Sequence, residues 1–264
     1  MISPLAHISP DAIIGKNVTI DPFASIHADV TIGDGTHVMS NAVIMTGTTI
    51  GKNCLIFPGA VIGAIPQDLK FVGEKTTVKI GDNTTIRECV TISRGTKDRW
   101  ETVIGSDCLL MAYAHVAHDC ILGNHVILAN AVQLAGHVEV GDYAILGGMT
   151  GAPQFARIGA HTYIAGHTVI TKDVPPYIKA GRTPLSYVGL NSVGLKRRNF
   201  SQEKVNEILD FYRTIFNKNL NTSQALESIE KEPASDERNM ILSFIRESKR
   251  GIIKGMSEEG PDDE

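Results

Sequence analysis

Hydrophobic positions recur every six residues along most of this chain. Stepping by six from Ile8 to Ile170 gives 28 positions, of which 24 hold Ile, Val or Leu. The exceptions are Asp68, Glu74, Asp98 and Ala152. The residue four places after each of these positions is Ala, Val, Thr or Cys everywhere except at Pro66. Such a repeat fits neither an α-helix nor the two-residue alternation of a hairpin sheet.

The six-residue repeat predicts a parallel β-solenoid with triangular coils. Three short strands and three corners make one coil, which buries the aliphatic and small residues and hydrogen-bonds to the coils above and below. Glycine often follows the aliphatic residue, as in "IGKN" and "LGNH", where a tight corner suits it. We expect residues 1–176 to form this β-helix, with loop excursions near 63–79 and 93–103.

Loops that project from a rigid scaffold often carry binding groups. The first excursion holds Asp68 and Lys70 in "PQDLK", and we expect it to contribute to a site. The second, "SRGTKDRWETV", is expected to be partly an expendable excursion.

The repeat stops after "KDVPPY", and the pattern then becomes helical. Three amphipathic helices are predicted, with N-caps at Ser201, Asn221 and Ser235. Residues 177–256 should therefore form a small C-terminal α-helical domain, followed by an acidic disordered tail at 257–264.

Composition narrows the class of protein. No apolar run approaches the roughly 18 residues that a membrane span needs, so no span is predicted. The start "MISPLAHISP" lacks the features of a signal peptide, and the four cysteines show no CxxC pairing. A cytoplasmic location is the simplest interpretation. No Gly-rich phosphate loop precedes a helix, which argues against an NTPase.

Polar residues gather in the stretch "MAYAHVAHDC" at 111–120. Residues eighteen apart should lie one above the other, which gives the column His118, Gly136 and Gln154, with Asp119 and His137 beside it. A histidine base oriented by a carboxylate could activate a hydroxyl, and the Gly136 N–H could stabilise an oxyanion. This combination describes acyl transfer from a thioester to an alcohol.

Two other interpretations of the polar stretch stay open. A zinc site would use His115, His118 and His137, but HxxH across a solenoid corner is weak evidence, and we predict no metal. The second alternative is a structural solenoid without chemistry.

Two surfaces suggest partners. Leu109, Ile127, Ile145 and Tyr163 form an outward apolar column, which favours a homotrimer over burial beneath the C-terminal helices. Residues 177–256 hold 14 Lys and Arg against 9 Asp and Glu, a basic surface that would attract an acidic carrier protein or a diphosphate. No nucleic-acid-reading motif accompanies it, so nucleic acid is the weaker alternative.

Several motifs together resemble the acyl-carrier-protein–UDP-N-acetylglucosamine O-acyltransferase family of lipid A synthesis. They are "PQDLK", "RECVTISRGT", "LLMAYAHVAHDC", "LANAVQLAGHVEV", "GGMTGAPQF", "DVPPY" and "GLKRR". The resemblance covers nearly the whole chain and implies a left-handed parallel β-helix, an exception to the usual handedness rule, in a homotrimer with active sites between subunits. It also implies transfer of a 3-hydroxyacyl group from acyl carrier protein to the 3-position of UDP-N-acetylglucosamine. No cofactor is implied, because the donor carries the phosphopantetheine.

The resemblance also implies roles for individual residues. His118 would be the base, supported by Asp119, and Gly136 would supply the oxyanion N–H. The implied substrate-binding residues are Asp68, Lys70, His115, His137, Gln154, Gly166, Asn191, Arg197 and Arg198. Among these, Gly166 would set the acyl length, and Arg197 and Arg198 would meet phosphates or the pantetheine arm.

The chain departs from familiar members at two positions. Ser93 and Pro153 stand where those members have histidine, near the expected sugar-nucleotide site, which leaves a 3-hydroxyl or a 3-amino sugar open. A related N-acyltransferase carries an extra domain before its helix, whereas the repeats here begin at residue 8. A γ-class carbonic anhydrase would share the helix but hold zinc.

Overall fold

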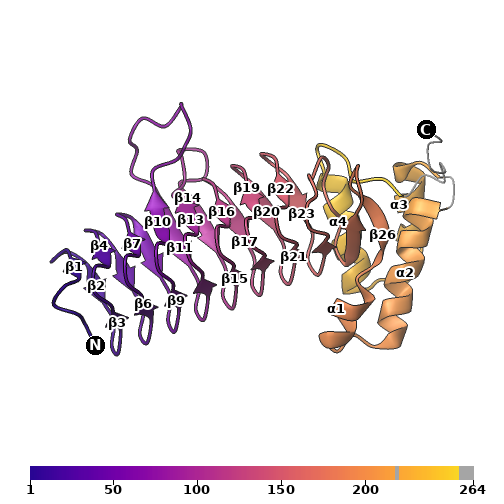
Figure 1. The fold of residues 1–264 in the computed structure, drawn as a ribbon. Helices are drawn as coiled ribbons and strands as arrows, with labels where there is room; N and C mark the ends of the chain where they lie inside the picture. The colour runs from indigo at the N-terminus through magenta and orange to yellow at the C-terminus, as the bar shows by residue number, and fades with distance from the viewer. Residues whose placement is uncertain (218–219, 256–264) are drawn as a thin grey trace, which may run out of the picture.

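The six-residue repeats build a three-sided, left-handed parallel β-helix with α-helices at its C-terminal end (Figure 1). The computed structural model describes residues 1–217 and 220–255. Parallel strands pair in the predicted register, so that His7 lies opposite Ser25, eighteen residues later. The predicted fold class is confirmed.

Three sheets form the faces of the prism. Sheet 1 contains β1 (His7–Ile8), β4 (Ser25–Ile26), β7 (Val43–Ile44), β10 (Val61–Ala64), β13 (Thr91–Ser93), β16 (His115–Val116), β19 (Gln133–Leu134) and β22 (Gly151–Ala152). Sheet 2 contains β2 (Ile13–Ile14), β5 (Thr31–Ile32), β8 (Thr48–Ile50), β11 (Thr77–Ile80), β14 (Glu101–Ile104), β17 (Ile121–Leu122), β20 (Glu139–Val140) and β23 (Arg157–Ile158). Sheet 3 contains β3 (Thr19–Ile20), β6 (His37–Val38), β9 (Leu55–Ile56), β12 (Thr85–Ile86), β15 (Leu109–Leu110), β18 (Ile127–Leu128), β21 (Ile145–Leu146), β24 (Tyr163–Ile164), β25 (Ile178–Gly181) and β26 (Ser186–Leu190).

The core consists of the repeating aliphatic and small residues. Cys54, Cys108 and Cys120 occupy small positions as buried free thiols, as the pattern predicts. Burial raises the pKa of the Cys120 thiol to about 12, so this sulfur is an inert packing atom at neutral pH.

The three corners of each coil are named after the sheet whose strands they follow. The first corner joins sheet 1 to sheet 2, the second joins sheet 2 to sheet 3, and the third joins sheet 3 to sheet 1. The second corner begins with glycine in every coil, because a Cβ there would lie 2.6 Å or less from an atom of the next coil. These glycines are Gly15, Gly33, Gly51, Gly81, Gly105, Gly123, Gly141 and Gly159.

Both predicted excursions leave the prism at the first corner. One loop connects β10 to β11 and the other connects β13 to β14, so they rise side by side from the same edge (Figure 1). The corner between β16 and β17, which holds His118, lies along this same edge. The fold therefore brings the loops to the predicted catalytic residues.

The C-terminal region begins with strands rather than a helix. β25 extends sheet 3 in parallel to β24, and β26 returns antiparallel to β25. Then follow α1 (Ser192–Arg197), α2 (Gln202–Asn217), α3 (Thr222–Glu230) and α4 (Asp236–Glu247). The β-hairpin and α1 were not predicted, because no repeat or long apolar period marks them.

The three predicted N-caps are present. The side chains of Ser201, Asn221 and Ser235 accept hydrogen bonds from the N–H groups three residues later, at 2.9–3.2 Å. None of the helices in the described ranges is long and apolar enough to span a membrane. The predicted acidic tail at 257–264 lies outside those ranges.

Candidate active site

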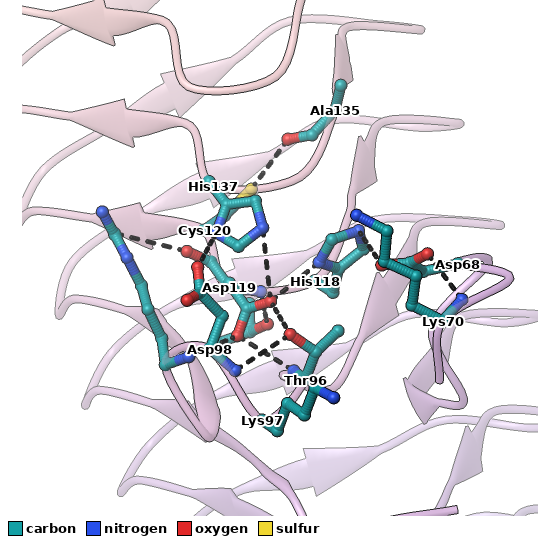
Figure 2. A network of polar contacts seen from close by, with 12 residues as sticks. Asp68, Lys70, Thr96, Lys97, Asp98, His118, Asp119, Cys120, Ala135 and His137 are labelled. Carbon is teal, nitrogen blue, oxygen red and sulfur yellow. Dashed lines mark hydrogen bonds and ion pairs between the residues drawn. The ribbon is translucent and has the colours of Figure 1, made fainter. Parts of the chain in front are cut away.

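A buried histidine–aspartate pair occupies the first corner after β16. The Nδ1 of His118 lies 2.8 Å from Oδ2 of Asp119, and the two residues are 4% and 0% exposed. The other ring nitrogen, Nε2, lies 4.0 Å from Oδ2 of Asp68 in the first loop. This arrangement holds the ring by one nitrogen and turns the other toward the loop (Figure 2).

The second loop holds Asp119 in place. The Thr96 backbone N–H donates to Oδ1 at 2.9 Å, the Thr96 hydroxyl donates to Oδ2 at 2.7 Å, and the Arg99 N–H donates to Oδ1 at 3.2 Å. Burial raises the pKa of Asp119, but hydrogen bonds from Thr96 and His118 outweigh burial, and the net pKa is lowered. Asp119 is therefore an ionised acceptor for the His118 ring. These contacts argue against the expectation that the loop is partly expendable, which only a deletion can test.

Gly136 lies directly beside the His118 ring in the next coil. A Cβ at Gly136 would stand 2.5 Å from Cε1 and 2.6 Å from Nε2 of His118, so only glycine leaves room for the ring. The predicted stacking is present: the His137 N–H donates to the His118 carbonyl, and the Phe155 N–H donates to the Gly136 carbonyl. Within the described residues, the Gly136 N–H has no hydrogen-bond partner.

His137 forms the second buried imidazole of the site. Its ring meets the His118 ring edge-on at 5.1 Å and stacks on Phe155 at 4.4 Å. Its Nδ1 lies 3.2 Å from Oδ2 of Asp98, in the second loop, and its Nε2 lies 3.8 Å from Oδ2 of Asp119. Burial lowers the pKa of His137, which favours the neutral ring at pH 7.

A hollow of about 550 Å³ opens beside these histidines. It is lined by Asp68, Lys70, Glu74, Thr96, Lys97, Asp98, His137, Gln154 and Phe155. The two loops are joined at its rim, where the Glu74 carboxylate accepts from the backbone N–H groups of Val72 and Lys97. The structure thus assembles the predicted residues Asp68, Lys70, His137 and Gln154 around one cavity.

His115 lies next to the pair but points out of sheet 1. Its Nδ1 is 2.7 Å from the Thr91 hydroxyl, and burial lowers the pKa of this ring. Ser93 and Pro153, the two residues that stand where familiar members of the resembled family have histidine, also lie at the first corner. Ser93 is buried at the end of β13, and Pro153 immediately precedes Gln154.

Four predicted binding residues lie away from the corner that holds His118. Gly166 is at the third corner, two residues after the end of β24. Asn191 caps α1 and donates to the His161 carbonyl at 2.8 Å, at the second corner. The Arg198 guanidinium donates to the Tyr143 carbonyl of that same corner at 3.1 Å.

Arg197 is exposed at the end of α1, beside Arg198. A single chain therefore does not bring Gly166, Asn191, Arg197 and Arg198 to the corner that holds His118.

Three side chains converge closely enough to hold a metal ion. Ligand atoms of His118, Asp119 and His137 lie within 4.8 Å of one another. His115, which the zinc alternative requires, is not among them. Both oxygens of Asp119 already accept hydrogen bonds from Thr96, which a metal would have to displace. The absence of a metal stays a prediction, which elemental analysis can test.

The residues missed from sequence are those of the second loop. Thr96 holds Asp119, Asp98 contacts His137, and the Arg99 N–H adds a third bond to Asp119. Thr96 falls in phase with the small residues of the repeat, which was a signal for its burial. The contacts themselves depend on the path of a non-repeating loop.

The β-helix and its polar corner define a transferase of the hexapeptide-repeat class. The protein-family model described as bacterial transferase hexapeptide (six repeats) matches residues 11–45, 29–64 and 101–136 of this chain. The model described as UDP-N-acetylglucosamine O-acyltransferase, domain 2, matches residues 173–253.

Curated relatives and solved structures give the particular family. The acyl-[acyl-carrier-protein]–UDP-N-acetylglucosamine O-acyltransferase of Herminiimonas arsenicoxydans is 41% identical over 73% of this chain and 76% of its own, and that of Janthinobacterium is 43% identical with the same coverage. The crystal structure of the UDP-N-acetylglucosamine acyltransferase from Bacteroides fragilis is 51% identical, with a TM-score of 0.95 over 96% of this chain and 100% of its own. The Acinetobacter baumannii structure is 41% identical, with a TM-score of 0.93 over 96% of this chain and 99% of its own. The chain belongs to the acyl-[acyl-carrier-protein]–UDP-N-acetylglucosamine O-acyltransferase family, which confirms the predicted resemblance.

Proposed function

We propose that this protein transfers a 3-hydroxyacyl group from acyl carrier protein to the 3-hydroxyl of UDP-N-acetylglucosamine, in lipid A biosynthesis. The observation that carries the proposal is the His118–Asp119 pair with Gly136 against the ring, in a chain of this family. The pair leaves Nε2 of His118 facing Asp68, which lines the hollow, and the neighbouring coil offers the Gly136 N–H, which has no acceptor within residues 1–217 and 220–255.

The chemistry begins with proton removal. Nε2 of His118 takes the proton of the sugar 3-hydroxyl, and that oxygen attacks the thioester carbonyl. Ionised Asp119, 2.8 Å from Nδ1, stabilises the imidazolium that forms. A positioned base of this kind contributes about 10²–10⁴-fold in rate.

The second half of the reaction breaks the carbon–sulfur bond. The tetrahedral oxyanion accepts the Gly136 N–H, a contribution of about 10²–10³-fold for one such donor. Collapse expels the pantetheine thiolate, which takes the proton back from Nε2 of His118. The products are the ester and the free thiol of the carrier, so the protein itself needs no cofactor.

The substrates would be bound by more than one subunit. Asp68, Lys70 and Gln154 line the hollow and would hold the sugar nucleotide, with His115 and His137 beside it. Gly166 of the third corner and the α1 residues Asn191, Arg197 and Arg198 would come from a neighbouring chain of a homotrimer. The apolar column of Leu109, Ile127, Ile145 and Tyr163 on sheet 3 supports such an assembly. The first three side chains are half-buried in one chain, and Tyr163 is exposed.

The partner and location follow from the substrates. The acyl group would arrive on acyl carrier protein, attracted to the exposed cations Lys196 and Arg197. A cytoplasmic location suits both the carrier and the sugar nucleotide. Sedimentation at the mass of a monomer would contradict the trimer.

Mass spectrometry tests the activity directly. The protein is incubated with UDP-N-acetylglucosamine and a series of 3-hydroxyacyl carrier-protein thioesters, beside a His118→Ala control. A product heavier by one hydroxyacyl group, absent in the control, supports the proposal. A product only from the 3-amino sugar nucleotide would replace the hydroxyl acceptor by an amine, with Ser93 and Pro153 as the residues to exchange.

Acyl length is tested with the same series of donors. Gly166→Met should shorten the preferred chain, because the methionine side chain would take up room at the third corner. Its Cβ would stand 2.9 Å from the Gly148 carbonyl oxygen, so the backbone there would have to shift. An unchanged preference would show that Gly166 does not set the length.

A further inference from the structure

A continuous chain of charged groups runs from Asp119 to the C-terminal helix. Arg99 contacts Asp119 twice, through its backbone N–H to Oδ1 at 3.2 Å and through Nη1 to the carbonyl at 3.4 Å. Its Nη2 lies 2.5 Å from Glu139, whose other oxygen lies 3.2 Å from Nε of Arg157. The Nη2 of Arg157 lies 3.0 Å from Glu247 in α4.

This chain joins three parts of the fold. Arg99 belongs to the second loop, Glu139 and Arg157 are paired on adjacent strands of sheet 2, and Glu247 ends α4. The Arg157 guanidinium also lies over the Phe244 ring of α4, 4.8 Å from its centre. The loop is therefore tied to sheet 2 and, through sheet 2, to a helix more than a hundred residues later.

We propose that Arg99 is a positioning residue, which holds the second loop in the conformation that lets Thr96 donate to Asp119. Thr96 is only three residues away, and its two hydrogen bonds orient the carboxylate that in turn orients His118. Glu139 and Arg157 fix the guanidinium from the side of sheet 2. The catalytic consequence of this inference rests on the proposed function, whereas its structural part concerns the loop alone.

These ion pairs act by ordering the second loop rather than by adding much stability. Isolated surface ion pairs stabilise proteins little, and the side chains here remain 24–59% exposed. Misplacement of a catalytic group by 1 Å, however, can cost about 10²-fold in rate. A loop with fewer fixed contacts samples more conformations, so the His118 pair would spend less time aligned.

Three variants isolate the role of Arg99. Arg99→Met removes the guanidinium and keeps the alkyl chain and the N–H, Arg99→Lys keeps the charge opposite Glu139, and Glu139→Gln breaks the chain without touching Asp119. Arg246→Met is the matched control, because Arg246 pairs with Glu230 at 2.7 Å and ties α4 to α3 instead of the prism.

Two readouts are measured on each full-length variant. The first is kcat and KM for acyl transfer at saturating donor, where Arg99→Met and Glu139→Gln should lower kcat roughly tenfold and leave KM within about twofold. Arg99→Lys should recover most of the loss. The second is hydrogen exchange of peptide 93–103 by mass spectrometry, which should be faster in Arg99→Met and Glu139→Gln but unchanged in Arg246→Met.

The outcomes separate this inference from the proposed function. A wild-type protein without acyl transfer would sink the proposed function, while exchange in peptide 93–103 would still test the loop. Unchanged exchange in both Arg99→Met and Glu139→Gln overturns the positioning role, whatever happens to kcat. Faster exchange with unchanged kcat, or an equal loss of kcat in Arg246→Met, also overturns it.

Discussion

The first and second corners of the prism share one backbone and differ in what their side chains do. In both, the third of the four corner residues has a left-handed conformation, with φ 62° at His137 and 60° at Tyr143. At the second corner, backbone N–H groups are capped by side chains of the next coil, as Asp142 caps Asn124 at 2.7 Å. At the first corner, the Gly136 N–H has no such cap among the described residues.

The aromatic groups of the two corners differ in the same way. At the second corner, His125, Tyr143, His161 and Tyr177 stack in succession at 4.4–5.4 Å, which closes that edge. At the first corner, one stacked pair remains, that of His137 with Phe155, and the ring nitrogens of His118 and His137 face carboxylates. A repetitive scaffold satisfies its polar groups coil by coil, so a reactive site arises where this pattern is broken.

The largest expected difference is between two variants in which one histidine of each corner is replaced by alanine. His118→Ala should reduce kcat by about 10²–10⁴-fold, because the proposed general base is lost. His125→Ala, which removes a ring stacked on Tyr143 at the second corner, should leave kcat within about twofold. Steady-state rates and thermal melts of both variants test this contrast, and equal losses of activity would remove the distinction between the corners.

Replacing one glycine at each corner by alanine should affect kcat at the first corner and the free energy of unfolding at the second. Gly136→Ala should lower kcat by about 10²-fold, because the new Cβ would meet the His118 ring at 2.5 Å. Gly123→Ala should instead lower the free energy of unfolding by about 1–3 kcal/mol, because its Cβ would meet the backbone nitrogen of Asp142 at 2.8 Å. Thermal melts and kcat are measured on each. Full activity in Gly136→Ala would contradict the proposed catalytic role of the His118 ring beside this glycine.

A threonine pair tests the second loop. Thr96→Val removes the hydroxyl that donates to Asp119 at 2.7 Å, which should lower kcat roughly tenfold and the free energy of unfolding by about 1.5–3 kcal/mol. Thr84→Val removes a buried hydroxyl that donates to the Gly105 carbonyl at 3.0 Å in the second corner. It should lower stability by about 0.5–1.5 kcal/mol and leave kcat unchanged. Chemical denaturation gives the loss of stability in both variants, and steady-state rates give kcat. An unchanged kcat in Thr96→Val would contradict a role for the loop in catalysis.

The periodic half of the site could be predicted, and the loop half could not. The position of His118 beside Gly136 could be predicted from the sequence alone, because residues eighteen apart lie one above the other in adjacent coils. The contacts of Thr96 and Arg99 depend on how an irregular loop folds back, for which no repeat exists. The hairpin of β25 and β26 was missed for the same reason, since the six-residue pattern ends before Ile178.

The smallest expected effect is a pH dependence of stability at the second corner. Burial, assisted by the nearby Arg198 charge, lowers the pKa of His161 to about 4. The unfolded residue has a pKa of about 6.5, so between these values the unfolded chain binds a proton that the folded chain does not. The contribution of His161 to unfolding free energy is therefore constant above about pH 6.5 and falls as the pH drops toward 4.

His161→Phe isolates this contribution. Phenylalanine can stack between Tyr143 and Tyr177 and has no counterpart of the buried Nδ1, which lacks a hydrogen-bond partner within the described residues. Urea denaturation of both proteins at pH 7.5 and 5 should show wild type losing about 1 kcal/mol more than the variant, after allowance for partial exposure. Identical losses would mean that His161 accepts its proton in the folded state, and that the second corner tolerates a charge as readily as the first.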